Sequence, residues 1–132
     1  METEAARVRQ LFDRLLGAPM LAFPRNRGPI DAPPKQGVYI IYDSDEKVLH
    51  VGRTLRAREG LRDRLRAHLR GRSSFVVSFL KGERHLLRDG HSFRYLEWDN
   101  DRDRALLEAY ATGSLCPAHI GLGRSTKASL YR

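Results

Sequence analysis

Residues 37–69 contain two short strand-like runs, a polar turn between them, an arginine-rich connection and a helix-like segment. The first run, 37–43, is rich in β-branched and aromatic residues, and the second, 48–52, follows a polar turn at 44–47. Two such runs with a short polar connection indicate an antiparallel hairpin. The hairpin therefore places two adjacent antiparallel strands in the predicted sheet.

The hairpin also predicts which side chains share a face. In the simplest register Asp43 pairs with Val48, and Tyr39 then lies opposite Gly52. Because side chains alternate between the two faces of a sheet, Tyr39 and His50 share one face as diagonal neighbours. A shift of the register by one residue would separate them.

Amphipathic patterns predict three helices around the hairpin. Residues 4–16 have apolar side chains at three- and four-residue spacing, and this helix suits either packing on the sheet or a dimer face. Residues 61–70 carry leucines at four-residue spacing and end at Gly71. Residues 102–113 follow the run Asp99-Asn100-Asp101, which offers an N-cap and first-turn acids.

The remaining segments complete an α+β fold. Residues 17–36 hold five of the six prolines, which predicts an irregular segment that wraps the surface. Two serines precede residues 75–80 as caps and favour a short helix there over a strand. Residues 93–98 alternate like a third strand. We therefore expect a small three-stranded antiparallel sheet flanked by helices, in the order β-β-α-(α)-β-α, with an extra N-terminal helix.

A chain of 132 residues suits a single globular unit, divided into residues 1–36 (helix and wrapping segment), 37–120 (main domain) and 121–132 (basic tail). It has no apolar run near the roughly 20 residues that cross a bilayer, and no secretory signal core. The single cysteine, Cys116, excludes a zinc ribbon and an internal disulfide. A cytoplasmic location is therefore expected, with Cys116 as a buried apolar residue.

Positive charge is concentrated in one stretch. Residues 53–72 contain eight arginines and two acids, a net charge of +6 in a chain whose total is +8. Such clustering is typical of a polyanion-binding surface, and arginine favours bidentate contacts with phosphate. The alternative is a solvated helix with ordinary solubility charge. We therefore expect a nucleic-acid partner, bound by the arginines of this stretch: Arg53, Arg56, Arg58, Arg62 and Arg66.

The two strands of the hairpin carry the triplets Gly37-Val38-Tyr39 and His50-Val51-Gly52. These are similar to the tripeptides that name the GIY-YIG nuclease superfamily, with His50 where the family usually has tyrosine. On the helix after the hairpin, Arg64 and His68 match an arginine followed four residues later by a histidine.

The resemblance continues to the end of the main domain and covers about 37–120. Glu108 matches a glutamate on a later helix, and Pro117 stands nine residues beyond it, as in the family. A second departure follows, because Ile120 stands where family members commonly have asparagine. The adjacent His119 could replace that asparagine in anchoring the last segment.

The resemblance implies a metal-dependent endonuclease that hydrolyses phosphodiester bonds by attack of activated water, with DNA favoured over RNA. Glu108 would be the sole protein ligand of Mg²⁺ or Mn²⁺, whose other ligands are water and phosphate oxygens. The alternative is a surface glutamate paired with Arg104, one turn earlier. Arg64, selected among the arginines by its spacing to His68, would clamp the scissile phosphate.

The remaining roles each have a structural alternative. Tyr39 would be the general base or would position it, unless it is simply a core tyrosine. His50 would accept a proton, since an imidazole pKa of about 6.5 suits neutral pH better than a phenol. It could instead bond the phosphate as tyrosine would, or be structural. His68 would support phosphate or leaving-group contacts, or only pack. A second function suits the same sequence, namely a nucleic-acid-binding module that has lost catalysis.

Overall fold

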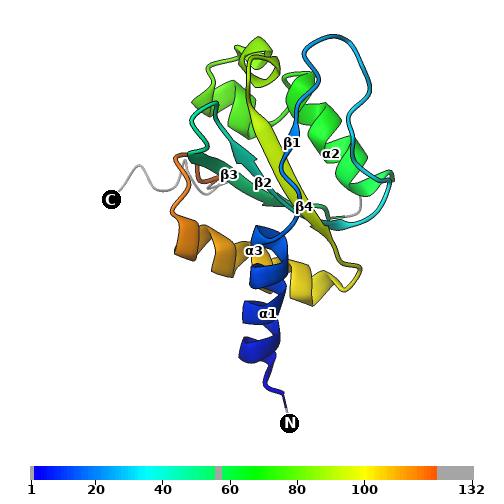
Figure 1. Cartoon of the computed structure of the whole chain (residues 1–132), viewed down its shortest axis with the longest axis vertical. Helices are drawn as coiled ribbons and strands as arrows, with labels where there is room; N and C mark the ends of the chain where they lie inside the picture. The colour runs from blue at the N-terminus through cyan, green and yellow to red at the C-terminus, as the bar shows by residue number, and fades with distance from the viewer. Residues whose placement is uncertain (1, 56–57, 122–132) are drawn as a thin grey trace, which may run out of the picture.

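The computed structural model describes residues 2–55 and 58–121 and has a four-stranded sheet at its centre (Figure 1). All neighbouring strands are antiparallel, which confirms the α+β class with an antiparallel sheet. Within the described ranges the strand order is β1-β4-β2-β3, with bounds Leu21–Ala22 for β1, Gly37–Tyr42 for β2, Val48–Arg53 for β3 and Ser92–Glu97 for β4. The predicted basic tail, apart from Gly121, and Arg56 lie outside the described residues.

The fourth strand corrects the prediction of three. β1 pairs Leu21 with Phe93 of β4, so the proline-rich segment supplies a short edge strand. The same segment also buries Phe23, Ile30 and Ala32 in the core instead of only wrapping the surface. Its prolines concealed this, since they interrupt the alternation that marks a strand.

The predicted helices are present, and so is the short one favoured over a strand. Thr3 caps α1 by accepting a bond from the Ala6 amide, and Asn100 caps α3 in the same way. A second short helix, η2, lies where no element was expected. No described helix is long and apolar enough to cross a membrane. The bounds are Glu4–Leu16 for α1, Gly60–Leu69 for α2, Phe75–Phe79 for η1, Arg84–Arg88 for η2 and Asp101–Leu115 for α3.

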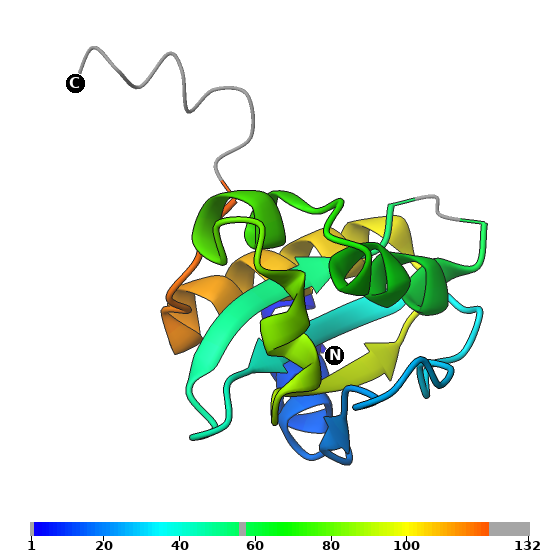
Figure 2. The same ribbon diagram turned by 90° about the horizontal axis from the view of Figure 1, so that it is seen from above.

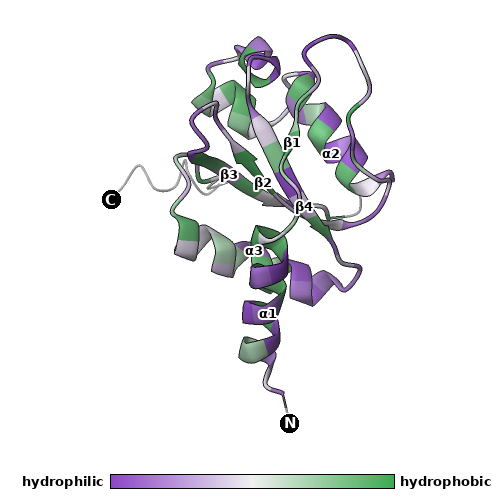
Figure 3. Ribbon diagram, viewed as in Figure 1, coloured by the Kyte–Doolittle hydropathy of each residue, from purple (hydrophilic) through white to green (hydrophobic). Residues whose placement is uncertain are grey.

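Strand β2 is buried along its whole length because helices cover both faces of the sheet. Tyr39 and Ile41 pack into one hydrophobic cluster with α2 and η1, whereas Val38, Ile40 and Tyr42 pack into another with α1 and α3. Figure 2 shows α2 and η1 over one side of the sheet and α3 behind the other. In Figure 3 β2 is coloured as hydrophobic, while α1 and α2 carry both colours. We call the two sides the α2 layer and the α1–α3 layer.

The hairpin register is confirmed where it matters for the site. Residues 38–41 pair with 53–50 as predicted, so Tyr39 lies opposite Gly52. Near the turn the prediction was wrong, because a register shift after Ile41 pairs Val48 with Tyr42. Asp43 is thereby free for the turn, where its carboxylate accepts bonds from two backbone amides.

Candidate active site

The glycines of the two triplets are required by close packing. A Cβ on Gly37 would overlap the carbonyl oxygen of Leu96 on the neighbouring strand. A Cβ on Gly52 would overlap the hydroxyl and Cζ of Tyr39. Glycine at position 52 therefore lets the Tyr39 ring lie flat against β3 and directs its hydroxyl toward α2.

Tyr39 is held there by a buried chain of hydrogen bonds. Its hydroxyl lies 2.7 Å from Nε2 of His68, whose Nδ1 lies 2.6 Å from Oγ of Ser73. Ser73 Oγ also accepts a bond from the Val76 amide at the start of η1. His68 is fully buried and both of its ring nitrogens have protein partners. Both ring nitrogens of His68 are therefore occupied by Tyr39 and Ser73 in this structure.

His50 is the centre of an aromatic cluster beside this chain. Its ring stacks on Phe75 at a centroid distance of 4.9 Å and lies 6.1 Å from the ring of Tyr39. Its Nδ1 lies 3.1 Å from Nδ1 of His119. The His119 amide in turn donates to the carbonyl of Leu49 on β3. The segment after α3 is therefore anchored to the β3 edge through His119, next to the position where the family has asparagine.

Glu108 reaches the same edge of the sheet from α3. It lines a pocket of about 240 Å³ together with His50 and His119. Its carboxylate forms an ion pair with Arg53, so the expected alternative partner, Arg104, was wrong. Arg104 is buried and donates to backbone carbonyls and to Asp101. Arg53 was predicted to contact nucleic acid, and in this structure it faces Glu108.

The charge of Arg64 acts on the whole group. Burial raises the pKa of Tyr39 to about 12, and the Arg64 guanidinium opposes that rise. Burial also raises the pKa of Glu108, against the opposing charges of Arg53 and Arg64. Arg64 is therefore close enough in space to influence residues on β2 and α3, although it lies on α2.

The two histidines beside Tyr39, His50 and His68, both have lowered pKa values. Burial, followed by the charges of His119 and Arg64, lowers the pKa of His50 to about 3. Burial lowers the pKa of His68 well below its usual value, and His50 and Arg64 add to the effect. The sequence interpretation assumed an ordinary imidazole pKa for His50. In the structure His50 is unprotonated at neutral pH but is a much weaker base than was assumed, because it is partly buried beside another imidazole.

The other arginines expected at a nucleic-acid surface differ in their surroundings. Arg62 donates to the carbonyl of Ala32, and Arg66 pairs with Glu59. Arg58 is exposed. Sequence clustering therefore found the basic region but not the internal bonds that some of its members make.

A metal would depend on Glu108. Among residues 2–55 and 58–121 no group of three or more histidine, cysteine or acidic side chains could hold an ion. A single carboxylate fits a hard divalent cation that takes its remaining ligands from water and phosphate. The Glu108 side chain is 26% exposed, so its oxygens are accessible from the pocket.

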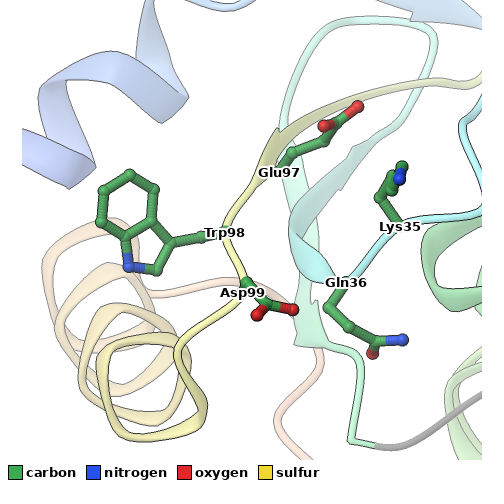
Figure 4. A pocket seen from close by; sticks show the side chains of 5 residues that line it. All are labelled: Lys35, Gln36, Glu97, Trp98 and Asp99. Carbon is green, nitrogen blue, oxygen red and sulfur yellow. The ribbon is translucent and has the colours of Figure 1, made fainter.

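A second pocket, of about 470 Å³, lies where β4 leads into α3 (Figure 4). Its lining combines Lys35 with Glu97 and Asp99, and none of the predicted site residues contributes to it. Trp98 turns away from Lys35 in Figure 4, and its indole donates to Asp103 instead. This pocket therefore shares no lining residue with the Glu108 pocket.

The surroundings of two residues near the site, Ser73 and Cys116, differ from the prediction. Ser73 was expected only as a helix cap, although its hydroxyl also holds His68. Cys116 was expected to be buried and is exposed, because it ends α3 in a left-handed conformation with φ of 48°. A serine five residues after the motif histidine was the only sequence signal for the hydrogen-bond chain.

Comparison with solved structures finds similarity to the GIY-YIG N-terminal endonuclease domain of UvrC from Thermotoga maritima, bound to its catalytic magnesium. The identity is 20%, the match covers 89% of this chain and 97% of that one, and the TM-score is 0.49. A point mutant of that domain, bound to its catalytic divalent cation, gives the same identity and TM-score. No protein-family model and no curated protein matches the chain.

Proposed function

We propose that the chain is a metal-dependent endonuclease of the GIY-YIG type, with DNA favoured over RNA as substrate. The observation that supports this best is the meeting of Tyr39, His50 and Glu108 at the β3 edge, within the field of the Arg64 charge. These groups supply a carboxylate ligand, proton-transfer groups and a fixed cation. That set is the minimum for hydrolysing a phosphodiester.

Glu108 would hold Mg²⁺ or Mn²⁺, which when bound polarises the phosphate and lowers the pKa of a bound water. Burial raises the pKa of the Glu108 carboxyl, and the Arg53 guanidinium opposes that rise and so favours the charged carboxylate. Arg64 would offset the negative charge that develops on the phosphoryl oxygens. Its position on a rigid helix fixes that charge before the substrate arrives.

Tyr39 would position the attacking water through its hydroxyl oxygen. When the Tyr39 hydroxyl donates to Nε2 of His68, the Nδ1–H of His68 donates to Ser73. The Tyr39 hydroxyl and both ring nitrogens of His68 are then hydrogen-bonded. In the reverse tautomer Nε2–H of His68 donates to the Tyr39 oxygen and Ser73 donates to Nδ1, so the Tyr39 O–H points away from His68. Because burial raises the pKa of Tyr39 to about 12, the hydroxyl stays protonated unless its proton moves toward His68.

His119 would determine which role His50 takes. If His119 donates across the 3.1 Å contact, Nδ1 of His50 accepts and its Nε2 carries a proton that can bond a phosphate oxygen. If His50 donates instead, its Nε2 is free to accept a proton from water. The two roles proposed for His50 therefore correspond to two tautomers of one histidine pair.

The direct test is cutting of supercoiled plasmid and branched DNA with Mg²⁺, Mn²⁺ or EDTA, beside a Glu108→Ala variant. Metal-dependent cutting that the variant lacks supports the proposal. No cutting by the unaltered chain under any metal condition contradicts it.

A second candidate function is a nucleic-acid-binding module without catalysis. The Arg53–Glu108 ion pair favours it, because the one candidate metal ligand already has a cationic partner. This module would bind DNA in a salt-sensitive way and cut it under no condition. If this candidate function is correct, the Arg53→Gln variant, which frees Glu108 from its ion pair, also fails to cut DNA.

A further inference from the structure

A pocket on the far side of α2 has an unusually basic lining. It has a volume of about 500 Å³, and four arginines line it: Arg27, Arg66, Arg70 and Arg88. No acidic side chain among the described residues lines it. We call it the arginine pocket.

The arginine pocket is separate from the Glu108 pocket. Arg64 and His68 face the Tyr39 side of α2. Arg66 stands two residues after Arg64, and Arg70 stands two residues after His68. Because an α-helix turns about 100° per residue, two residues rotate a side chain by about 200°. Arg66 and Arg70 therefore point to the side of α2 opposite Arg64 and His68, across a helix about 10 Å wide.

The wall of the arginine pocket is held in place by backbone contacts. Arg88 donates to the carbonyls of Pro24 and Asn26, which fixes the chain before the pocket. After the pocket, Ile30 is buried in the core, and Arg62 donates to the carbonyl of Ala32. The proline-rich segment is thus tied to α2 and η2 at both ends, and the pocket exists before any ligand binds.

Two of the four guanidiniums are available for a ligand. Arg88 is used by the wall and Arg66 pairs with Glu59. Arg27 and Arg70 are exposed, and their guanidiniums make no hydrogen bond or ion pair with any residue in 2–55 or 58–121. The unpaired charges of Arg27 and Arg70 repel one another, so an anion that enters the pocket lowers the energy of the arrangement.

We infer that the arginine pocket binds the phosphate backbone of nucleic acid at a distance from the scissile phosphate. This rests on the proposed function, and it adds a second contact region on the opposite side of α2. Arginine suits this ligand because its planar guanidinium makes paired bonds with phosphate oxygens. Such contacts position a duplex without reading its sequence.

The test is a salt titration of binding with the full chain, in EDTA, using a fluorescein-labelled DNA duplex. Each phosphate contact adds about 0.9 to the slope of log affinity against log salt concentration. The variant Arg27→Gln/Arg70→Gln should lower that slope by about 2 and weaken binding at fixed salt. The matched control Arg9→Gln/Lys47→Gln removes the same charge from exposed positions outside the pocket and should leave the slope unchanged.

The outcomes separate this inference from the function on which it rests. Suppose that the unaltered chain cuts plasmid and both double variants keep its salt slope. That result overturns phosphate binding by the arginine pocket and leaves the nuclease proposal standing. Equal losses in both double variants also overturn it, since a general charge effect would then explain binding. A chain that neither binds nor cuts DNA overturns the nuclease proposal and the pocket together. If Arg27→Gln/Arg70→Gln unfolds, Arg27→Lys/Arg70→Lys replaces it, and an unchanged affinity at fixed salt contradicts the paired-bond contact.

Discussion

The two layers that cover the sheet treat buried polar groups in opposite ways. In the α1–α3 layer, Arg104 is buried with donors on backbone carbonyls, and Asp103 pairs with Arg7 and accepts from Trp98. In the α2 layer, His50 and His68 are packed beside Tyr39 with their pKa values lowered. The charged groups of the α1–α3 layer are paired, whereas the α2 layer contains two histidines with lowered pKa values that can exchange protons.

This difference is consistent with structural support by the α1–α3 layer and proton transfer in the α2 layer. Breaking a buried pair of charges is strongly destabilising, so the paired groups of the α1–α3 layer suit structural support. Neutral titratable groups held next to a fixed cation are typical of sites that carry out proton transfer. The Glu108 pocket lies at the β3 edge, where the two layers meet.

The strongest way to disturb the supporting layer is Arg104→Met. Removal of the guanidinium leaves the buried carbonyl of Thr54 and the partly buried carbonyls of Leu55 and Asp99 without these donors. We expect a loss of about 3–5 kcal/mol in the free energy of unfolding, measured by denaturant titration. The control Arg102→Met removes a neighbouring exposed guanidinium and should barely move the midpoint. Equal shifts in both variants would contradict the structural role of Arg104.

In the α2 layer, Arg64→Gln should affect the reaction more than the fold. Loss of a fixed charge beside the phosphate should slow single-turnover cutting by roughly 10²–10³-fold, as for a lost oxyanion donor. Arg64 is only partly buried, so the unfolding midpoint should change little. A normal cutting rate in this variant would show that another arginine holds the phosphate.

Tyr39→Phe removes the hydroxyl that His68 holds. We expect cutting to fall by about 10²-fold, within the range of a lost acid–base group. The variant also leaves Nε2 of His68 buried without a partner, at a cost of about 1–3 kcal/mol in unfolding free energy. The matched control Tyr42→Phe lies on the α1–α3 side of the same strand, and its cutting rate should be unchanged. If both variants cut equally well, the α2 layer has no special role in catalysis.

The smallest expected effect is a pH dependence of stability. The pKa of His50 is lowered to about 3, and that of His68 is lowered too, so the unfolded chain binds protons near pH 6 that the folded chain does not. Stability should therefore fall as pH is lowered from 7 to 5.5, by about 1 kcal/mol for each histidine. This window lies above the usual range of carboxyl titration. A His50→Gln variant should show a shallower fall, and a pH-independent unfolding midpoint in the unaltered chain would contradict the lowered pKa values.

The sequence predicted what depends on local pattern. Period-two alternation gave the register that brings Tyr39 beside His50, and four-residue spacing singled out Arg64 and His68. It did not predict the pairing of Glu108 with Arg53, because the partners are 55 positions apart and lie on different elements, α3 and β3. It also missed the lowered pKa of His50, since that shift follows from burial and not from residue type. The chemistry of the site therefore depends on tertiary packing that the motifs do not encode.

The most direct test of the site compares one carboxylate from each pocket. Single-turnover cutting of a labelled DNA duplex in Mn²⁺ should be lost in Glu108→Gln, whose pocket contains His50 and His119. The control Glu97→Gln changes the pocket of Figure 4 and should cut at the unaltered rate. Equal cutting by Glu108→Gln and the unaltered chain would contradict the assignment of the active site to the β3 edge.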